Sequence, residues 1–135
     1  MMEIVLVEDD PDDIYFFQQA CVNLHQAPKV TVLNNGVEFI SHVQNSDSQM
    51  PVYLLDLNMP HKGGLEALEE LQQKGLVNSL LVICYTTSDS PKDIAKAYHL
   101  GAKSYLTKPN RLTELTELVQ TLIKYWFQYN QQRKG

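Results

Sequence analysis

Four separate segments of this 135-residue chain carry side chains that could do chemistry together. They are Glu8-Asp9-Asp10, Asp56-Leu57-Asn58, Thr86-Thr87-Ser88 and Thr107-Lys108-Pro109. Carboxylates gathered at one site repel one another unless a cation compensates them, and hard oxygen ligands favour Mg²⁺. An aspartate beside a divalent ion and a lysine is a suitable nucleophile for a phosphoryl group, which a nearby hydroxyl can also bind. The segments predict such a site if the fold brings them together.

Five short apolar runs predict the strands that position these segments. The runs do not alternate strictly, which is typical of strands covered on both faces of a parallel sheet. They span Ile4–Val7, Val30–Leu33, Val52–Leu55, Leu80–Tyr85 and Lys103–Thr107. Four of the five end at or beside one of the polar segments. Because ligands of open α/β sheets bind outside the carboxyl ends of the strands, we expect the polar groups to meet at that edge.

Segments with helical spacing alternate with these runs. Asp10 and Pro11 predict the start of the first helix, and Gly75 the end of the third. The fourth helix is expected to begin after Ser90 and to end at Gly101. The last and longest has an apolar stripe at Leu112, Leu115, Leu118/Val119, Leu122 and Trp126. The alternation predicts an α/β fold, a doubly wound (βα)5 three-layer sandwich around an open parallel sheet.

Composition limits the functions that the chain can have. Its length fits one domain, which we place at residues 1–127, followed by a tail at 128–135. The net charge of −5 argues against a nucleic-acid partner, and no apolar run is long enough to cross a membrane. We find no signal peptide, so Cys21 and Cys84 are expected to be buried, reduced thiols. These features predict a cytoplasmic protein.

The polar segments resemble the receiver domains of two-component response regulators. The matching residues are Glu8-Asp9, Asp56 in DLNMP, Thr86 in YTTS and Lys108 in SYLTKP, in that order. The resemblance covers residues 3–125 and implies a CheY-like, flavodoxin-like fold with sheet order 2-1-3-4-5. The sequences PDD at 11–13, TTSDSPKDI and SYLTKP are similar to stand-alone receivers that partner bacterial phytochrome-type kinases.

The resemblance also implies the roles of the acidic residues. Asp56 would be the phosphoacceptor, loaded from a phosphohistidine of a sensor histidine kinase. Asp9 and Asp56 would ligate Mg²⁺, with the backbone carbonyl of Asn58 as a third ligand and Glu8 acting through water. Glu8 stands where the family more often has aspartate, which lengthens the arm by one methylene.

The remaining roles concern the switch. Lys108 would pair with a phosphoryl oxygen, and Thr86 would be the switch hydroxyl. Phosphate at Asp56 would pull Thr86 inward and vacate space that Tyr105 fills. The surface of the fourth helix, fifth strand and fifth helix would then change. The family usually has a cis peptide before the proline that follows this lysine, here Pro109.

These roles imply two-component signal transduction rather than enzymatic turnover. The chain would catalyse only its own phosphorylation and slow dephosphorylation. The switched face would dock a downstream target, or the phosphoryl group would pass to a phosphotransfer protein. One alternative is a haloacid-dehalogenase-type phosphohydrolase, but that class needs an acid where Asn58 stands. Another is a constitutive dimerising or adaptor receiver that phosphorylation does not control.

The carboxyl-terminal aromatic segment, Tyr125-Trp126-Phe127-Gln128-Tyr129, leaves two interpretations open. An exposed aromatic cluster can mark an interface, so this segment could support a homodimer. The face of the fourth helix, fifth strand and fifth helix is the other candidate dimer surface. Alternatively, the aromatic side chains pack against the domain's own sheet.

Overall fold

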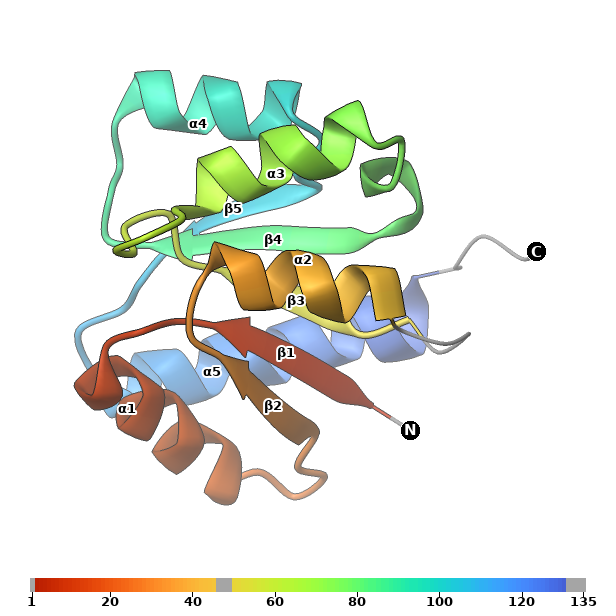
Figure 1. Ribbon diagram of the computed structural model, residues 1–135. Helices are drawn as coiled ribbons and strands as arrows, with labels where there is room; N and C mark the ends of the chain where they lie inside the picture. The colour runs from red at the N-terminus through yellow and green to blue at the C-terminus, as the bar shows by residue number, and fades with distance from the viewer. Residues whose placement is uncertain (1, 46–49, 131–135) are drawn as a thin grey trace.

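The computed structural model describes residues 2–45 and 50–130. Within them, five parallel strands form one sheet in the order β2-β1-β3-β4-β5, as the resemblance implied (Figure 1). The strands are β1 (Glu3–Val7), β2 (Lys29–Leu33), β3 (Val52–Leu55), β4 (Leu81–Thr86) and β5 (Ser104–Thr107). Each predicted apolar run forms a strand, and the ends differ from the prediction by one residue at most. The predicted fold class is therefore confirmed.

Helices cover both faces of this sheet. In chain order they are α1 (Pro11–Val22), α2 (Gly36–Asn45), α3 (Gly64–Gln73), α4 (Pro91–His99) and α5 (Leu112–Ile123). A 3₁₀ turn, η1, spans Val77–Ser79, and a π-helical segment, η2, spans Lys124–Tyr129. Helices α2, α3 and α4 lie on one face, and α1 and α5 lie on the other (Figure 1). The result is the predicted three-layer sandwich.

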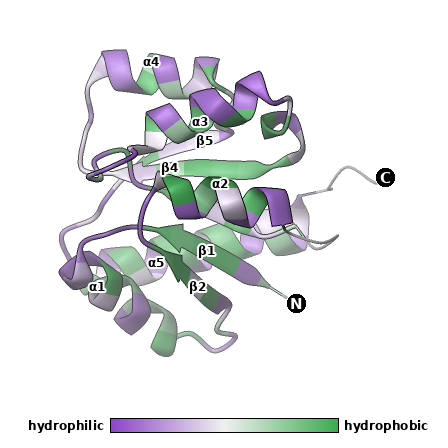
Figure 2. Ribbon diagram, in the orientation of Figure 1, coloured by the Kyte–Doolittle hydropathy of each residue, from purple (hydrophilic) through white to green (hydrophobic). Residues whose placement is uncertain are grey.

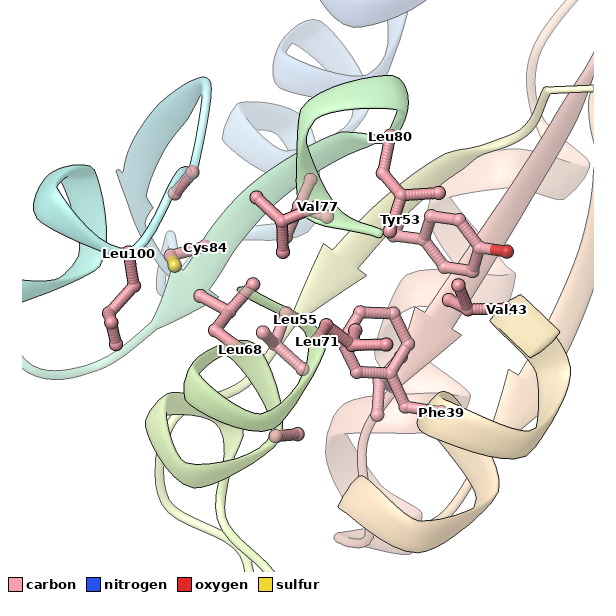
Figure 3. Packing of buried hydrophobic residues seen from close by; sticks show 14 of the residues in the cluster. Phe39, Val43, Tyr53, Leu55, Leu68, Leu71, Val77, Leu80, Cys84 and Leu100 are labelled. Carbon is pink, nitrogen blue, oxygen red and sulfur yellow. The ribbon is translucent and has the colours of Figure 1, made fainter. Parts of the chain in front are cut away.

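Two hydrophobic clusters flank the sheet, because successive side chains of each strand point to opposite faces. Along β1, Val5 and Val7 join the cluster under α2, α3 and α4, whereas Ile4 and Leu6 join the cluster under α1 and α5. Figure 3 shows the first cluster, in which the rings of Phe39 and Tyr53 lie 5.2 Å apart between centroids. Hydropathy follows the layers, since the strands are largely apolar and the outer helix surfaces largely polar (Figure 2).

The helix ends follow the predicted capping residues. The Asp10 carboxylate accepts hydrogen bonds from the N–H groups of Asp12 at 2.8 Å and Asp13 at 3.4 Å, so it caps α1. Ser90 Oγ accepts one from the fourth helix in the same way. Gly75, at a φ of 73°, and Gly101, at a φ of 107°, follow the ends of α3 and α4 in the left-handed region that glycine tolerates.

The end of the chain departs from the predicted stripe. Leu115 and Leu122 are buried as expected, but Leu112 is exposed and Trp126 is only half-buried. After Ile123 the α-helix widens into η2, where hydrogen bonds span five residues instead of four, which changes the residues that face the core. Helical structure continues through Tyr129, so the domain boundary at 127 remains a prediction, and residues 131–135 lie outside the described part.

The aromatic segment fits both interpretations left open above, because some of its side chains pack against the core and others are exposed. Trp126 and Phe127 pack partly against the core, whereas Tyr125 and Tyr129 are 52% and 68% exposed. The Tyr125 and Trp126 rings meet edge to face, with centroids 4.9 Å apart. The segment therefore covers the sheet with one side and presents tyrosines to solvent with the other.

Both cysteines are buried free thiols, as predicted. Cys21 lies on the buried side of α1 and Cys84 lies within β4, in opposite hydrophobic clusters. Burial raises the pKa of Cys21 to about 11 and that of Cys84 to about 12. Neither thiol is positioned or activated for chemistry at neutral pH.

Substitution of Gly101 by alanine is expected to destabilise the fold strongly. A Cβ at this position would lie 2.1 Å from Val77 Cγ1, and the φ of 107° strains any other residue. Together the overlap and the strain should cost about 2–4 kcal/mol of unfolding free energy. Gly75→Ala is the matched control, because Gly75 also has a positive φ but no atom within 4 Å of its added Cβ.

Urea unfolding of the two glycine variants separates these causes. The control should lose only about 1–2 kcal/mol, the cost of the backbone conformation. Equal losses for Gly101→Ala and Gly75→Ala would show that α4 and η1 move apart without cost and that the contact is unimportant.

Candidate functional site

The predicted acids, Asn58 and Lys108 meet at the carboxyl edge of the sheet. They line a cavity of about 310 Å³ that opens between the loops following β1, β3, β4 and β5, which lie at one end of the molecule (Figure 1). The lining residues are Glu8, Asp9, Asp10, Asp13, Asp56, Asn58, Thr87 and Lys108. Acids, a hydroxyl and a lysine that follow different strands thus lie around one cavity, at the edge where the sequence analysis expects them.

The sheet itself holds three of these residues in register. Glu8, Asp56 and Lys108 each stand one residue past a strand, yet each still donates its backbone N–H to a carbonyl of an adjacent strand. The N···O distances are 2.8, 3.0 and 2.9 Å respectively. Their side chains therefore project from rigid backbone rather than from free loop.

The start of α3 packs against the backbone of Asp56. A Cβ added to Gly64 would lie 2.4 Å from the Asp56 carbonyl oxygen, so only glycine fits there. Farther along the loop, the Asn58 N–H donates to Asp56 Oδ1 over 3.3 Å. These contacts orient the Asp56 carboxylate, which is only 5% exposed.

Lys108 is the cation of the site. Its Nζ lies 2.5 Å from Glu8 Oε1, 2.8 Å from Asp13 Oδ2 and 3.5 Å from Asp56 Oδ2. The ammonium also stands 5.7 Å from the ring centroid of Tyr85, a cation–π distance. Since the Lys108 side chain is 8% exposed, water screens these contacts little.

Burial and charge shift the pKa values of this cluster. Burial raises the pKa of Glu8 to about 7, although the hydrogen bond from Lys108 opposes the shift and the charge of Asp56 adds to it. For Lys108, burial lowers the pKa, but the hydrogen bonds to Asp13 and Glu8 outweigh it, and the net pKa is raised. Lys108 is therefore charged across the physiological range, whereas Glu8 titrates near neutrality.

Three carboxylates of the site fit a divalent cation. Glu8, Asp9 and Asp56 each offer an oxygen, and these oxygens all lie within 4.8 Å of one another. Such an all-oxygen donor set suits a hard cation, and the like charges gain from its presence. Asn58 also lines the cavity, and its carbonyl remains the predicted additional ligand.

Cation binding is expected to depend on pH through Glu8. A cation at this site favours the ionised carboxylate, so it must displace the proton that Glu8 carries below about pH 7. Affinity for Mg²⁺ should therefore fall up to about tenfold per pH unit below 7 and level off above it. Calorimetric titration between pH 5.5 and 8.5 measures this slope, and Glu8→Gln should flatten it. An unchanged slope in that variant would assign the proton to another group.

The two predicted switch residues, Thr86 and Tyr105, do not line the cavity. Thr86 is fully buried, and its Oγ1 accepts hydrogen bonds from Asn58 Nδ2 at 3.4 Å and from the Ser88 N–H at 3.5 Å. Tyr105 is half-buried, and its hydroxyl donates to the Ser88 carbonyl over 2.8 Å. A path of contacts thus joins Asp56 through Asn58 to Thr86, and the same loop carries Ser88, the partner of Tyr105.

Two features go beyond the sequence analysis. The described residues contain no cis peptide bond, so the bond between Lys108 and Pro109, which the sequence left open, is trans, unlike the usual form in the family. Asp13 lines the cavity and binds Lys108, a contact that the sequence analysis did not predict. Its place three residues after the Asp10 cap, on the first turn of α1, is the signal that could have indicated it.

Comparison with known proteins identifies the family. Residues 4–120 match the family model described as the response regulator receiver domain. The chain belongs to the response regulator receiver family. As a receiver domain, it is a signalling protein of two-component systems rather than an ordinary enzyme, and receiver domains act with sensor histidine kinases.

Individual relatives support the assignment. Response regulator Rcp1 of Synechocystis is 31% identical over 130 residues, which cover 93% of this receiver and 88% of that protein. The transcriptional regulatory protein CiaR of Streptococcus pneumoniae is 32% identical, but this receiver spans only 55% of it. The chain is thus similar to stand-alone receivers and to the receiver part of longer regulators.

Solved structures agree with the fold. The phosphorylated cyanobacterial phytochrome response regulator RcpA has a TM-score of 0.85 and 28% identity, covering 98% of this chain and 99% of that one. The Mn²⁺-bound form of Rcp1 has a TM-score of 0.81 and 29% identity, covering 99% and 100%. The second structure shows that a relative binds a divalent metal. None of the helices described over residues 2–45 and 50–130 has the length and apolar composition of a transmembrane segment.

Proposed function

We propose that Asp56 is the phosphoacceptor of this receiver and that it is loaded from a phosphohistidine of a sensor histidine kinase. The observation that carries the proposal is the position of its carboxylate. Asp56 Oδ2 lies 3.5 Å from the Lys108 ammonium, and an Asp56 oxygen lies within 4.8 Å of oxygens of Glu8 and Asp9. A nucleophile flanked by a cation and a metal-binding carboxylate pair is suited to phosphoryl transfer.

The phosphoryl transfer uses only the residues of this site and the divalent cation that they would hold. An Asp56 oxygen forms a bond to phosphorus as the N–P bond of the donor breaks, and the imidazole leaves with the bonding electron pair. Lys108 donates to a phosphoryl oxygen, while Glu8 and Asp9 hold the cation with Asp56 and with the Asn58 carbonyl. These residues would hold a divalent cation, which we propose to be Mg²⁺ and which would supply neutralising charge for the transferred group.

The loaded state, in which Asp56 carries the phosphoryl group, would act through Thr86 and Tyr105. A phosphoryl oxygen offers the Thr86 hydroxyl an acceptor, and this contact exists only in the loaded state, so it shifts the population of the loop after β4. The same loop supplies the Ser88 carbonyl to Tyr105. We propose that the face formed by α4, β5 and α5 changes and docks a downstream target or supports relay to a phosphotransfer protein.

The relatives suggest the partner. RcpA is a cyanobacterial phytochrome response regulator, so we propose a phytochrome-type histidine kinase as the donor and the cytoplasm as the compartment. The receiver would catalyse its own loading from small phosphodonors and slow hydrolysis of its acyl phosphate. We infer that Tyr125 and Tyr129, the exposed tyrosines of η2, contribute to a homodimer.

Intact mass spectrometry tests the acceptor directly. Incubation with acetyl phosphate and Mg²⁺ should add the mass of one phosphoryl group, and EDTA should prevent the gain. Borohydride reduction converts an aspartyl phosphate to homoserine, so peptide mapping should find homoserine at position 56. Modification elsewhere, or no gain in folded protein that binds Mg²⁺, would favour the constitutive adaptor.

Beryllofluoride, which mimics the phosphoryl group, tests the output. Size-exclusion chromatography should show a shift to a dimer that requires both Mg²⁺ and beryllofluoride. A dimer of the same stability with and without beryllofluoride would mean that assembly does not depend on loading.

A further inference from the structure

Lys108 has more carboxylate partners than the proposed mechanism uses. Its ammonium carries three N–H donors, and three carboxylates surround it. Glu8 and Asp13 take the short contacts, at 2.5 and 2.8 Å, and Asp56 lies farther away at 3.5 Å. The hydrogen bonds to Glu8 and Asp13 leave one N–H for a phosphoryl group on Asp56, but they also hold the ammonium 3.5 Å from Asp56 Oδ2. One of the two short contacts therefore has to lengthen if the ammonium moves toward that group.

The burial of the two close partners decides which contact is released. The Glu8 side chain is 1% exposed, so losing its cation would leave a buried carboxylate without compensation, which is costly. The Asp13 side chain is 40% exposed on the first turn of α1, where water can solvate it at little cost. Asp13 is therefore the carboxylate that can release the Lys108 ammonium to a phosphoryl group.

We propose that Asp13 is a positioning residue that holds the Lys108 ammonium in the unphosphorylated state and competes for it with the incoming phosphoryl group. The inference rests on the proposed function, because it assumes loading of Asp56. In this scheme Asp13 contacts neither the phosphorus atom nor the molecule that donates the phosphoryl group. It acts through Lys108 and slows phosphorylation by holding the ammonium back from Asp56.

Neutralising Asp13 tests the proposal. Asp13→Asn should load from acetyl phosphate roughly fivefold faster than wild type and bind beryllofluoride roughly fivefold more tightly, the size of one partly exposed ion pair. Asp13→Glu keeps the charge and should return both values toward wild type. Asp12→Asn is the matched control, since Asp12 is an exposed acid of the same helical turn that does not line the cavity. It should change neither value.

A double-mutant cycle separates the proposed route from general electrostatics. In a Lys108→Met background, Asp13→Asn should leave the loading rate unchanged, because there is no ammonium to release. Persistence of the acceleration in that background, or an equal acceleration in Asp12→Asn, would overturn the inference in favour of weaker repulsion of the anionic donor. Loading by Asp13→Asn at or below the wild-type rate would also overturn it. If wild type itself does not load, the proposed function fails, and this inference fails with it.

Discussion

Asp56→Asn protein is expected to gain no phosphoryl mass from acetyl phosphate and Mg²⁺. The amide keeps the shape of the side chain and can still accept the Asn58 N–H, but it is not a nucleophile. It also removes one carboxylate from the cation site, so Mg²⁺ affinity should fall on the order of ten- to a hundredfold. Mass spectrometry and calorimetric titration measure the two losses.

The same substitution should stabilise the metal-free protein. Glu8, Asp13 and Asp56 share the ammonium of Lys108, and Asp9 lies close to Glu8 and Asp56, so neutralising one acid relieves repulsion. We expect a gain of about 1–2 kcal/mol in unfolding free energy at pH 8 with EDTA. Asp12→Asn is the control, because Asp12 is an exposed acid that does not line the cavity, and it should load normally. Mass gain in Asp56→Asn protein would place the acceptor elsewhere.

Lys108→Met should impair both loading and stability. Removing a positioned cation from a phosphoryl-transfer site is expected to slow loading by about 10²–10³-fold. The methionine also leaves Glu8 buried without its cation, which should cost roughly 3–5 kcal/mol at pH 8. Lys103→Met is the control, because Lys103 is an exposed lysine just before β5.

The stability loss of Lys108→Met should depend on pH in a definite direction. The pKa of Glu8 in the folded state, already about 7, rises further when the hydrogen bond and charge of Lys108 are lost. A group with a raised folded pKa stabilises the protein below its unfolded pKa, near 4.5, and this stability is lost as pH rises through the folded value. The loss of unfolding free energy in Lys108→Met, relative to wild type, should thus be smaller at pH 5.5 than at pH 8. Urea unfolding at both values checks the sign, and a deficit independent of pH would exclude Glu8 as its source.

The sheet and the position of the site could be predicted because both depend on local patterns. Apolar runs located the strands to within one residue, and the rule that ligands bind at carboxyl ends located the cavity. Capping by Asp10 and Ser90 could be predicted for the same reason, since each capping side chain accepts a hydrogen bond from an N–H no more than three residues away. Such features need no knowledge of distant contacts.

Features that depend on long side chains or on distant partners could not be predicted. The contact between Asp13 and Lys108 joins residues 95 positions apart, and it depends on the reach of a lysine across two loops. The change from α5 to η2 alters which aromatic residues face the core, and periodicity that assumes an α-helix misses it. The hydroxyl partner of Tyr105 is a backbone carbonyl of Ser88, which leaves no trace in residue type.

Trp126 gives this receiver an optical reporter remote from its chemistry. It is the single tryptophan of the chain, and it lies half-buried in η2, which follows the end of α5 farthest from the strand ends that carry Asp56 (Figure 1). Cation binding cannot quench it by direct contact. A change in emission intensity or wavelength on phosphorylation, at a concentration where the protein stays monomeric, therefore shows without a label that a chemical event at one end of the sheet reaches the other.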